Sequence, residues 1–185
     1  MRCFKEFIKC LPHLMKTDLD VEVEIAGEDK ICYGGHQPGK KDTWGEWAKR
    51  YIADAGLSNR VRFLGRLSYA SYREWLQRSW CHVYLTHPFV CSWSLLESMA
   101  CDIRIVASNS PPVTEFCRSA EGVELVDNNN LLDIVGAIRR ALRASSQSLG
   151  STAQPLRWNA LGNLSLEASI TQWNRVTGLD LNTRD

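Results

Sequence analysis

The sequence lacks the features that would place it in several common classes of protein. No apolar run approaches the ~20 residues that a membrane-spanning helix needs, and the first residues contain no uninterrupted apolar stretch typical of a signal peptide. Its 22 lysines and arginines nearly balance its 21 aspartates and glutamates. A net charge of +1 gives no electrostatic reason to expect binding to nucleic acid or to an anionic membrane. We therefore expect a soluble protein of the cytoplasm.

The sequence also lacks the cysteine spacing of a metal site or of a disulfide framework. Its seven cysteines occur singly, with no Cys-x-x-Cys or Cys-x-x-His pair. An odd, unpatterned set of this kind favours reduced thiols and no structural metal. The cysteines are Cys3, Cys10, Cys32, Cys81, Cys91, Cys101 and Cys117.

Helical and strand patterns alternate along the chain. Apolar residues recur at helical spacing between Phe4 and Leu14, which predicts a helix over 3–15. Strands are expected near 21–27, 61–64, 82–85, 103–107 and 123–126, and further helices over about 43–56, 68–78, 93–101, from Pro111 onward and over 130–144. Strands separated by helices predict a doubly wound, Rossmann-like parallel sheet with helices on both faces.

Composition divides the chain into a domain, a linker and a terminal helix. The alternating pattern fills 1–145, which at this length is one domain with its own core. Small polar residues then predict a linker over 146–160. Apolar residues at helical spacing return in 161–178, which we predict to be a C-terminal helix.

The most informative stretch runs from Val83 to Ser108. It reads as a strand, a polar loop, a helix that opens on Ser92-Trp93-Ser94, and a second strand. A buried parallel strand that leads into a helix N-terminus is where α/β proteins bind anionic ligands. Glu97, one turn inside that helix, could accept hydrogen bonds from sugar hydroxyls. The stretch resembles the donor-binding core of the retaining, two-domain (GT-B-type) glycosyltransferases of group 1.

The resemblance implies roles for residues around this helix start. Glu97 matches the second glutamate of the family's Glu-x₇-Glu motif, which binds the ribose of the nucleotide. Ser92, Trp93, Ser94 and Leu95 match the segment whose backbone amides approach the donor diphosphate. Two simpler interpretations stay open: a capping box from Ser94 to Glu97, and an ordinary serine N-cap.

The resemblance extends to two neighbouring loops. Gly65-Arg66-Leu67 is similar to the family's Phe-Leu-Gly-Arg-Leu turn, an edge that recognises the base, although a plain turn that needs glycine explains it equally well. His87 lies where a donor sugar is expected, although loop histidines are more often merely solvated. Phe89 occupies the position of the family's first glutamate, as in a subgroup that reads Pro-Phe-Val-Leu-Ser-Trp-Ser. Catalytic residues therefore stay unassigned.

Three other stretches carry weaker signals. Gly34 to Lys41 nearly matches a phosphate-binding loop, but Lys41 replaces the final hydroxyl, so we expect a surface insertion. Arg2-Cys3-Phe4 resembles the family's Arg-Gly-Phe at the start of a helix, and Lys5 is more simply a solvated residue. The loop from Ser108 to Glu115 is expected to shape the rim of the pocket.

The order of elements departs from the family at one place. There the domain begins with a strand at the centre of the sheet, whereas this chain begins with a helix. We therefore expect the first central strand to be lacking and the chain to be a piece of a longer enzyme.

The resemblance implies the C-terminal donor-binding domain of a glycosyltransferase that moves a sugar from a nucleoside-diphosphate sugar with retention. It would need no metal or cofactor, would depend on an acceptor domain in a longer or separate chain, and would be inactive alone. The alternative is a non-catalytic nucleotide-binding or interaction module.

Overall fold

The computed structural model describes residues 3–17, 20–30, 38–39, 42–117, 120–148 and 166–177. Its helices are α1 (Phe4–Met15), α2 (Trp44–Asp54), α3 (Tyr69–Gln77), α4 (Trp93–Ala100), α5 (Pro111–Cys117), α6 (Leu131–Ser148) and α8 (Leu166–Thr177). Its strands are β1 (Val23–Ala26), β2 (Val61–Gly65), β3 (Cys81–Tyr84), β4 (Arg104–Ser108) and β5 (Val123–Val126).

The observed elements follow the alternation predicted from the sequence. Most bounds agree within about two residues, the uncertainty of any helix or strand end. The main difference is α6, which continues to Ser148, so the first residues of the expected linker are helical. The rest of that linker lies outside the described residues, and α8 lies within the expected terminal helix, ending one residue before its predicted end.

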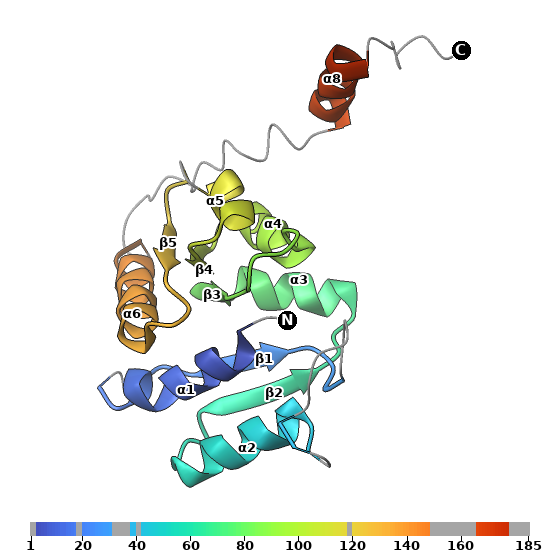
Figure 1. The fold of residues 1–185 in the computed structure, drawn as a ribbon. Helices are drawn as coiled ribbons and strands as arrows, with labels where there is room; N and C mark the ends of the chain where they lie inside the picture. Colours follow the sequence, from blue (N-terminus) through green and yellow to red (C-terminus); the bar gives the residue numbers. More distant parts are fainter. Residues whose placement is uncertain are drawn as a thin grey trace.

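The strands form two parallel sheets. β1 pairs with β2, with Val23 opposite Val61, and β4 pairs with β3 on one side and β5 on the other. No ladder between described residues joins β1 to β3. Figure 1 shows the start of α1 between these two strands, where the chain is anchored by a 3.1 Å hydrogen bond from the Cys3 amide to the Leu85 carbonyl. The architecture is thus the expected Rossmann-like α/β layer, interrupted between β1 and β3.

Side chains of β4 alternate between two hydrophobic clusters, which places helices on both faces of the second sheet. Val106 packs into one cluster with buried residues of α1 and α6. Its neighbours Ile105 and Ala107 pack into the other cluster, with Leu95 of α4 and Val113 of α5. This confirms the doubly wound arrangement.

Helix α1 links the two sheets. Its apolar face is fully buried through Ile8, Leu11 and Leu14. These side chains share one cluster with Val61 of β2 and with residues of α6. The hydrophobic core around α1 is therefore continuous between the two sheets, although no backbone hydrogen bonds between described residues pair β1 with β3.

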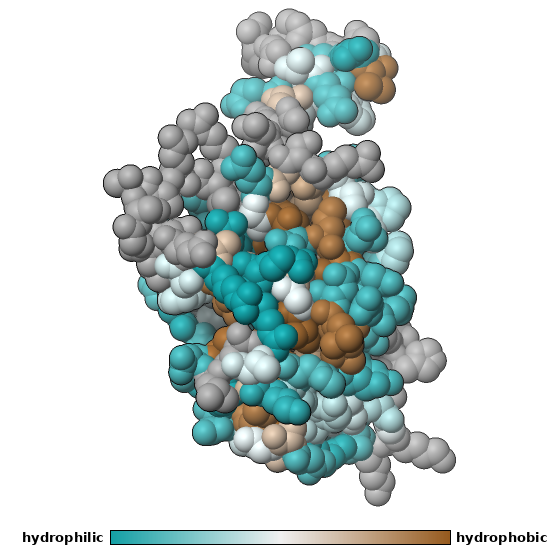
Figure 2. All heavy atoms as spheres, turned by 90° about the vertical axis from the view of Figure 1, so that its left-hand side faces the viewer, coloured by the Kyte–Doolittle hydropathy of each residue, from teal (hydrophilic) through white to brown (hydrophobic). Residues whose placement is uncertain are grey.

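The described residues on the face drawn in Figure 2 are mainly hydrophilic. On the face drawn in Figure 2, hydrophobic residues emerge in small patches among hydrophilic ones. None of the helices in the described part of the chain is both long and apolar enough to cross a membrane.

Candidate functional site

The candidate site begins where β3 ends and the chain turns into α4. Ser92 is the N-cap of α4, with extended backbone (φ −88°, ψ 147°), and its hydroxyl accepts a hydrogen bond of 3.4 Å from the Ser94 amide. The buried Tyr84 hydroxyl accepts a second bond, of 3.0 Å, from the Ser92 amide. Strand β3 therefore fixes the first residue of the helix directly.

The position of this N-cap shows that the capping-box interpretation of Glu97 is wrong. A capping box pairs the N-cap with the third helical residue, which here is Leu95, and Ser94 already lies inside α4. The structure does contain a capping box elsewhere, between Thr43 and Glu46 at the start of α2. Its Thr-x-x-Glu spacing was a readable signal that the sequence analysis missed.

The carboxylate of Glu97 has no hydrogen-bond or ion-pair partner among the described residues. The Glu97 side chain is half-buried. Desolvation by burial raises the pKa of the neighbouring Cys101 thiol, and the charge of Glu97 adds to this effect while Arg73 opposes it. The carboxylate is thus free to accept hydrogen bonds from a ligand, and its ribose-binding role stays a prediction.

The amides at the start of α4 are mostly engaged within the chain. Those of Ser92 and Ser94 donate as described above, and the Leu95 amide donates to the Ser92 carbonyl at 3.0 Å. The Trp93 amide has no acceptor among the described residues, and its indole side chain is 78% exposed. Leu95 has a fully buried side chain that belongs to the core. An anion at this helix start would therefore meet the Trp93 amide and the two serine hydroxyls.

Gly65, Arg66 and Leu67 lie at the carboxyl end of β2, in the other sheet. Gly65 adopts φ +64°, a left-handed conformation that favours glycine. Its carbonyl accepts a hydrogen bond of 2.8 Å from the Gly27 amide. Arg66 is exposed and pairs with Glu28 at 3.3 Å, while Leu67 is half-buried. The geometry explains the glycine, and the structure does not bring this turn into described contact with α4.

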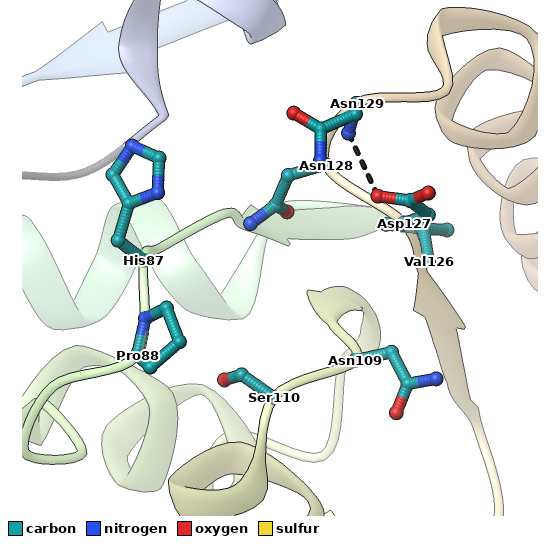
Figure 3. Close-up of a pocket in the computed structure, with 8 residues that line it drawn as sticks. All are labelled: His87, Pro88, Asn109, Ser110, Val126, Asp127, Asn128 and Asn129. Atoms are coloured by element: carbon teal, nitrogen blue, oxygen red, sulfur yellow. Dashed lines mark hydrogen bonds between the residues drawn. The ribbon is translucent and has the colours of Figure 1, made fainter.

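His87 lies beside a hollow at the carboxyl ends of β3, β4 and β5. Figure 3 shows His87 and Pro88 on one side of this hollow and residues of the two following loops on the other. Its volume is about 380 Å³. The residues that line it are His87, Pro88, Asn109, Ser110, Val126, Asp127, Asn128 and Asn129. The loop after β4 thus contributes to a pocket rim, as expected, while Phe89 stands outside it and is 63% exposed.

A closed ring of hydrogen bonds holds these strand ends together. The Ser108 hydroxyl accepts from the Thr86 amide at 2.7 Å and donates to Asn128 Oδ1 at 2.7 Å. Asn128 Nδ2 completes the ring by donating to the Thr86 carbonyl at 2.8 Å. Sequence reasoning missed Asn128, because its distant partners leave no local spacing to read.

The described cysteines do not form a metal or nucleophile site. No group of three or more potential metal ligands occurs among the residues that the structure describes. Burial raises the pKa of Cys3 and Cys117 to about 11 and that of Cys10 and Cys81 to about 12. Near neutral pH these side chains are therefore protonated thiols.

Two of the weaker sequence signals fall largely outside the described residues. Arg2 is not described, and of the stretch from Gly34 to Lys41 only residues 38 and 39 are. Lys5 is exposed on α1.

Solved structures share this fold at low sequence identity. The C-terminal domain of LpcC, a glycosyl transferase group 1 family protein from Francisella tularensis, is 20% identical, with a TM-score of 0.64 over 81% of this chain and 73% of that one. Sucrose-phosphate synthase from Thermosynechococcus elongatus is 19% identical, with a TM-score of 0.64 over 91% of this chain and 41% of that one. Anabaena HepE, solved with UDP and glucose, is 16% identical, with a TM-score of 0.63 over 94% of this chain and 44% of that one.

The chain therefore spans less than half the length of the latter two proteins. No curated protein matches it. The family model of the glycosyl transferases group 1 matches residues 3–154, which include both strand–helix turns described above. Because that match covers most of its length, the chain belongs to the glycosyl transferases group 1.

Proposed function

We propose that this chain is the C-terminal, donor-binding domain of a glycosyltransferase that transfers a sugar from a nucleoside-diphosphate sugar with retention. The family match and the likeness to a separately solved C-terminal domain support this proposal. The observation that carries it is Glu97. Its half-buried carboxylate stands one turn inside α4 with no described partner, which suits it to accept hydrogen bonds from ribose hydroxyls.

The neighbouring residues suit the other parts of such a donor. The Trp93 amide, together with the hydroxyls of Ser92 and Ser94, would donate hydrogen bonds to the diphosphate at a positive helix terminus. The turn that begins at Gly65 would meet the base, and His87 would meet the sugar. We propose that these groups bind the donor without a metal or cofactor.

The chemistry would take place against an acceptor domain. This chain spans 41% and 44% of the two longer proteins described above, so we propose that a longer or separate chain supplies that domain. Alone, the chain would bind the donor without transferring its sugar. We place this activity in the cytoplasm.

A non-catalytic nucleotide-binding or interaction module is the second candidate. Phe89 favours it, because this exposed phenyl ring occupies the position of the family's first glutamate. A phenyl ring has no carboxylate oxygen that could accept a hydrogen bond from a sugar hydroxyl or pair with a developing positive charge.

Calorimetric titration with UDP, GDP and ADP tests nucleotide binding by the full chain. We expect one of them to bind, and Glu97→Gln to weaken it about tenfold, since a charge-assisted hydrogen bond is lost. Glu121→Gln is the matched control, because Glu121 is an exposed residue outside every candidate site segment. No binding by any nucleotide, or equal binding by both variants, would overturn the assignment of Glu97.

The corresponding nucleotide sugars separate the two candidates. A donor domain should bind the sugar conjugate at least as tightly as the free nucleotide. A module that has lost the sugar contacts should bind the free nucleotide more tightly.

A further inference from the structure

The two sheets of the domain meet at two unpaired strand edges. Among the described residues, β1 pairs only with β2, and β3 pairs only with β4. Figure 1 shows the start of α1 between the free edges of β1 and β3. A free edge exposes backbone donors and acceptors, so it is a place where a further strand can be added.

Helix α1 shows that β1 and β3 run in the same direction. Its first turn lies at the carboxyl end of β3, where the Cys3 amide donates to the Leu85 carbonyl at 3.1 Å. Its last turn lies at the amino ends of β1 and β2, where Arg60 donates to the Met15 carbonyl at 3.0 Å and to the Val21 carbonyl at 2.8 Å. A strand added between β1 and β3 can therefore be parallel to both.

The edge of β3 carries backbone groups that point away from its own sheet. The Ile105 and Asn109 amides donate toward β5, so the alternate residues of β4 face β3. By the observed register, Val83 and Leu85 then face away from β4. The Leu85 carbonyl agrees with this, because it accepts from Cys3. The backbone of Val83 has no partner on that side among the described residues.

The edge of β1 is free in the same way. The Val23 and Gly27 amides donate toward the β2 side at 2.9 and 2.8 Å. The residues that alternate with them, Glu24 and Ala26, therefore direct their backbone groups away from β2. In the described part of the chain, no backbone group pairs with them there.

The two edges share one apolar support. Ile25 of β1 and Val83 of β3 both pack against the cluster that contains Ile8 and Leu11 of α1. One helix therefore covers the same face of both sheets and holds their edges side by side. All of β1, and all of β3 except Tyr84, is only half-buried, whereas β4 has a strand on each side and is almost entirely buried. Parallel strands covered on both faces are apolar runs, which indicates the composition of a segment that would fit here.

We propose that the facing edges of β1 and β3 bind one extended, apolar segment of a different polypeptide, which adds to the sheet as a parallel strand. Each described strand of this chain is already paired within one of the two sheets, so the segment comes from elsewhere. It runs with β1 and β3 and ends beside Cys3. Its backbone bonds to Ala26 on one side and to Val83 on the other, and the two sheets become one.

Amide hydrogen exchange of the full chain with the peptide acetyl-Lys-Val-Val-Ile-Val-Val-Gly-Lys-amide tests this binding mode. In the free chain the Ala26 and Val83 amides should exchange faster than the Tyr84 amide, which faces β4. Peptide at about ten times its dissociation constant should slow exchange at Ala26 and Val83 about tenfold. Leu125, whose amide faces the outer side of β5, is the internal control and should not change.

A second peptide, with proline in place of isoleucine, separates strand addition from apolar adhesion. Proline lacks the amide that a central strand needs, so this peptide should leave exchange at Ala26 and Val83 unchanged. Equal protection by both peptides, or equal protection of Leu125, would overturn the proposal. Slow exchange of Ala26 and Val83 in the free chain would also overturn it, because the edges would then already be paired.

Light scattering tests a second copy of this chain as the occupant. We expect a monomer without peptide and one bound peptide per chain at saturation. A dimer that protects Ala26 and Val83 without peptide would overturn the assignment to a different polypeptide. No nucleotide is present in these measurements, so their outcome is independent of the proposed donor site.

Discussion

The two sheets of this domain are stabilised in different ways. The β1–β2 sheet has mostly half-buried strands. Two exposed arginines, Arg62 of β2 and Arg78 at the end of α3, both pair with Glu24 of β1. In the β3–β4–β5 sheet, β4 is almost entirely buried, and its polar bonds lie in the ring around Ser108.

The difference suits the two sheets to different tasks, and the candidate site lies mainly on the second. Solvent screens the ion pairs of the first sheet, so each contributes little to stability. Buried hydrogen bonds of the second sheet are costly to break, which makes its strand ends the more rigid platform. Most candidate site residues, including Glu97 and His87, lie on that platform.

The largest effect should follow from breaking the core that unites the sheets. Leu11→Ala removes a fully buried side chain of α1 and should lower the free energy of unfolding by about 3 kcal/mol. Denaturant unfolding measures it. Leu132→Ala, at a position 72% exposed on α6, is the control and should cost less than about 0.5 kcal/mol. Similar losses for both variants would show that α1 does not carry the shared core.

The second effect concerns the polar ring of the β3–β4–β5 sheet. Ser108→Ala leaves the buried Thr86 amide without its acceptor, so we expect a loss of about 2 kcal/mol in denaturant unfolding. Asn129→Ala, an exposed neighbour, should have almost no effect. An unchanged stability in Ser108→Ala would contradict the rigidity that we assign to these strand ends.

A smaller effect is expected from removing the hydrogen bond that links β3 to the start of α4. Tyr84→Phe removes the hydroxyl that accepts from the Ser92 amide, and we expect a loss of about 1 kcal/mol with faster hydrogen exchange at that amide. Tyr69→Phe, at an exposed position, is the matched control. Unchanged exchange at Ser92 would mean that the helix start does not depend on this bond.

The smallest effect belongs to the ion pairs of the β1–β2 sheet. Burial pushes the pKa of Glu24 upward, but hydrogen bonds and charge from Arg62 and Arg78 outweigh it, so this pKa lies below its ordinary value of 4.5. A lowered folded-state pKa contributes stability above the unfolded value, and that stability is lost as the pH falls through the folded value.

Glu24→Gln should therefore cost at most about 1 kcal/mol at neutral pH, and the difference from the original chain should shrink on acidification. Unfolding free energies at pH 7 and pH 3 measure this. Glu121→Gln is an exposed control. A difference that grows at low pH would reverse the sign worked out above.

How much the sequence could predict differs between local and distant features. The spacing of apolar residues and the positions of turn residues predicted each strand and helix that the structure describes. Burial of one face of an element imposes this spacing on neighbouring residues of the sequence. The Gly65 turn was readable for the same reason, since its positive φ requires a permissive residue.

The candidate site was only partly predictable. The segment around Ser92 to Glu97 was found by resemblance, and the serine N-cap that the sequence left open is confirmed at Ser92. Its hydrogen bond to Tyr84, eight residues away, could not be predicted. The hollow beside His87 arises from three loops that meet in space. Contacts of that kind leave no spacing in the sequence.

Amide chemical-shift mapping with UDP, GDP and ADP would test the central claim most directly. The account predicts that one nucleotide shifts the amides of Trp93 and Glu97 while those of Asn109 and Ser110 stay unchanged, and that Glu97→Gln diminishes these shifts at the same concentration. Shifts confined to other parts of the chain, or none with any nucleotide in a folded sample, would contradict a donor site at the start of α4.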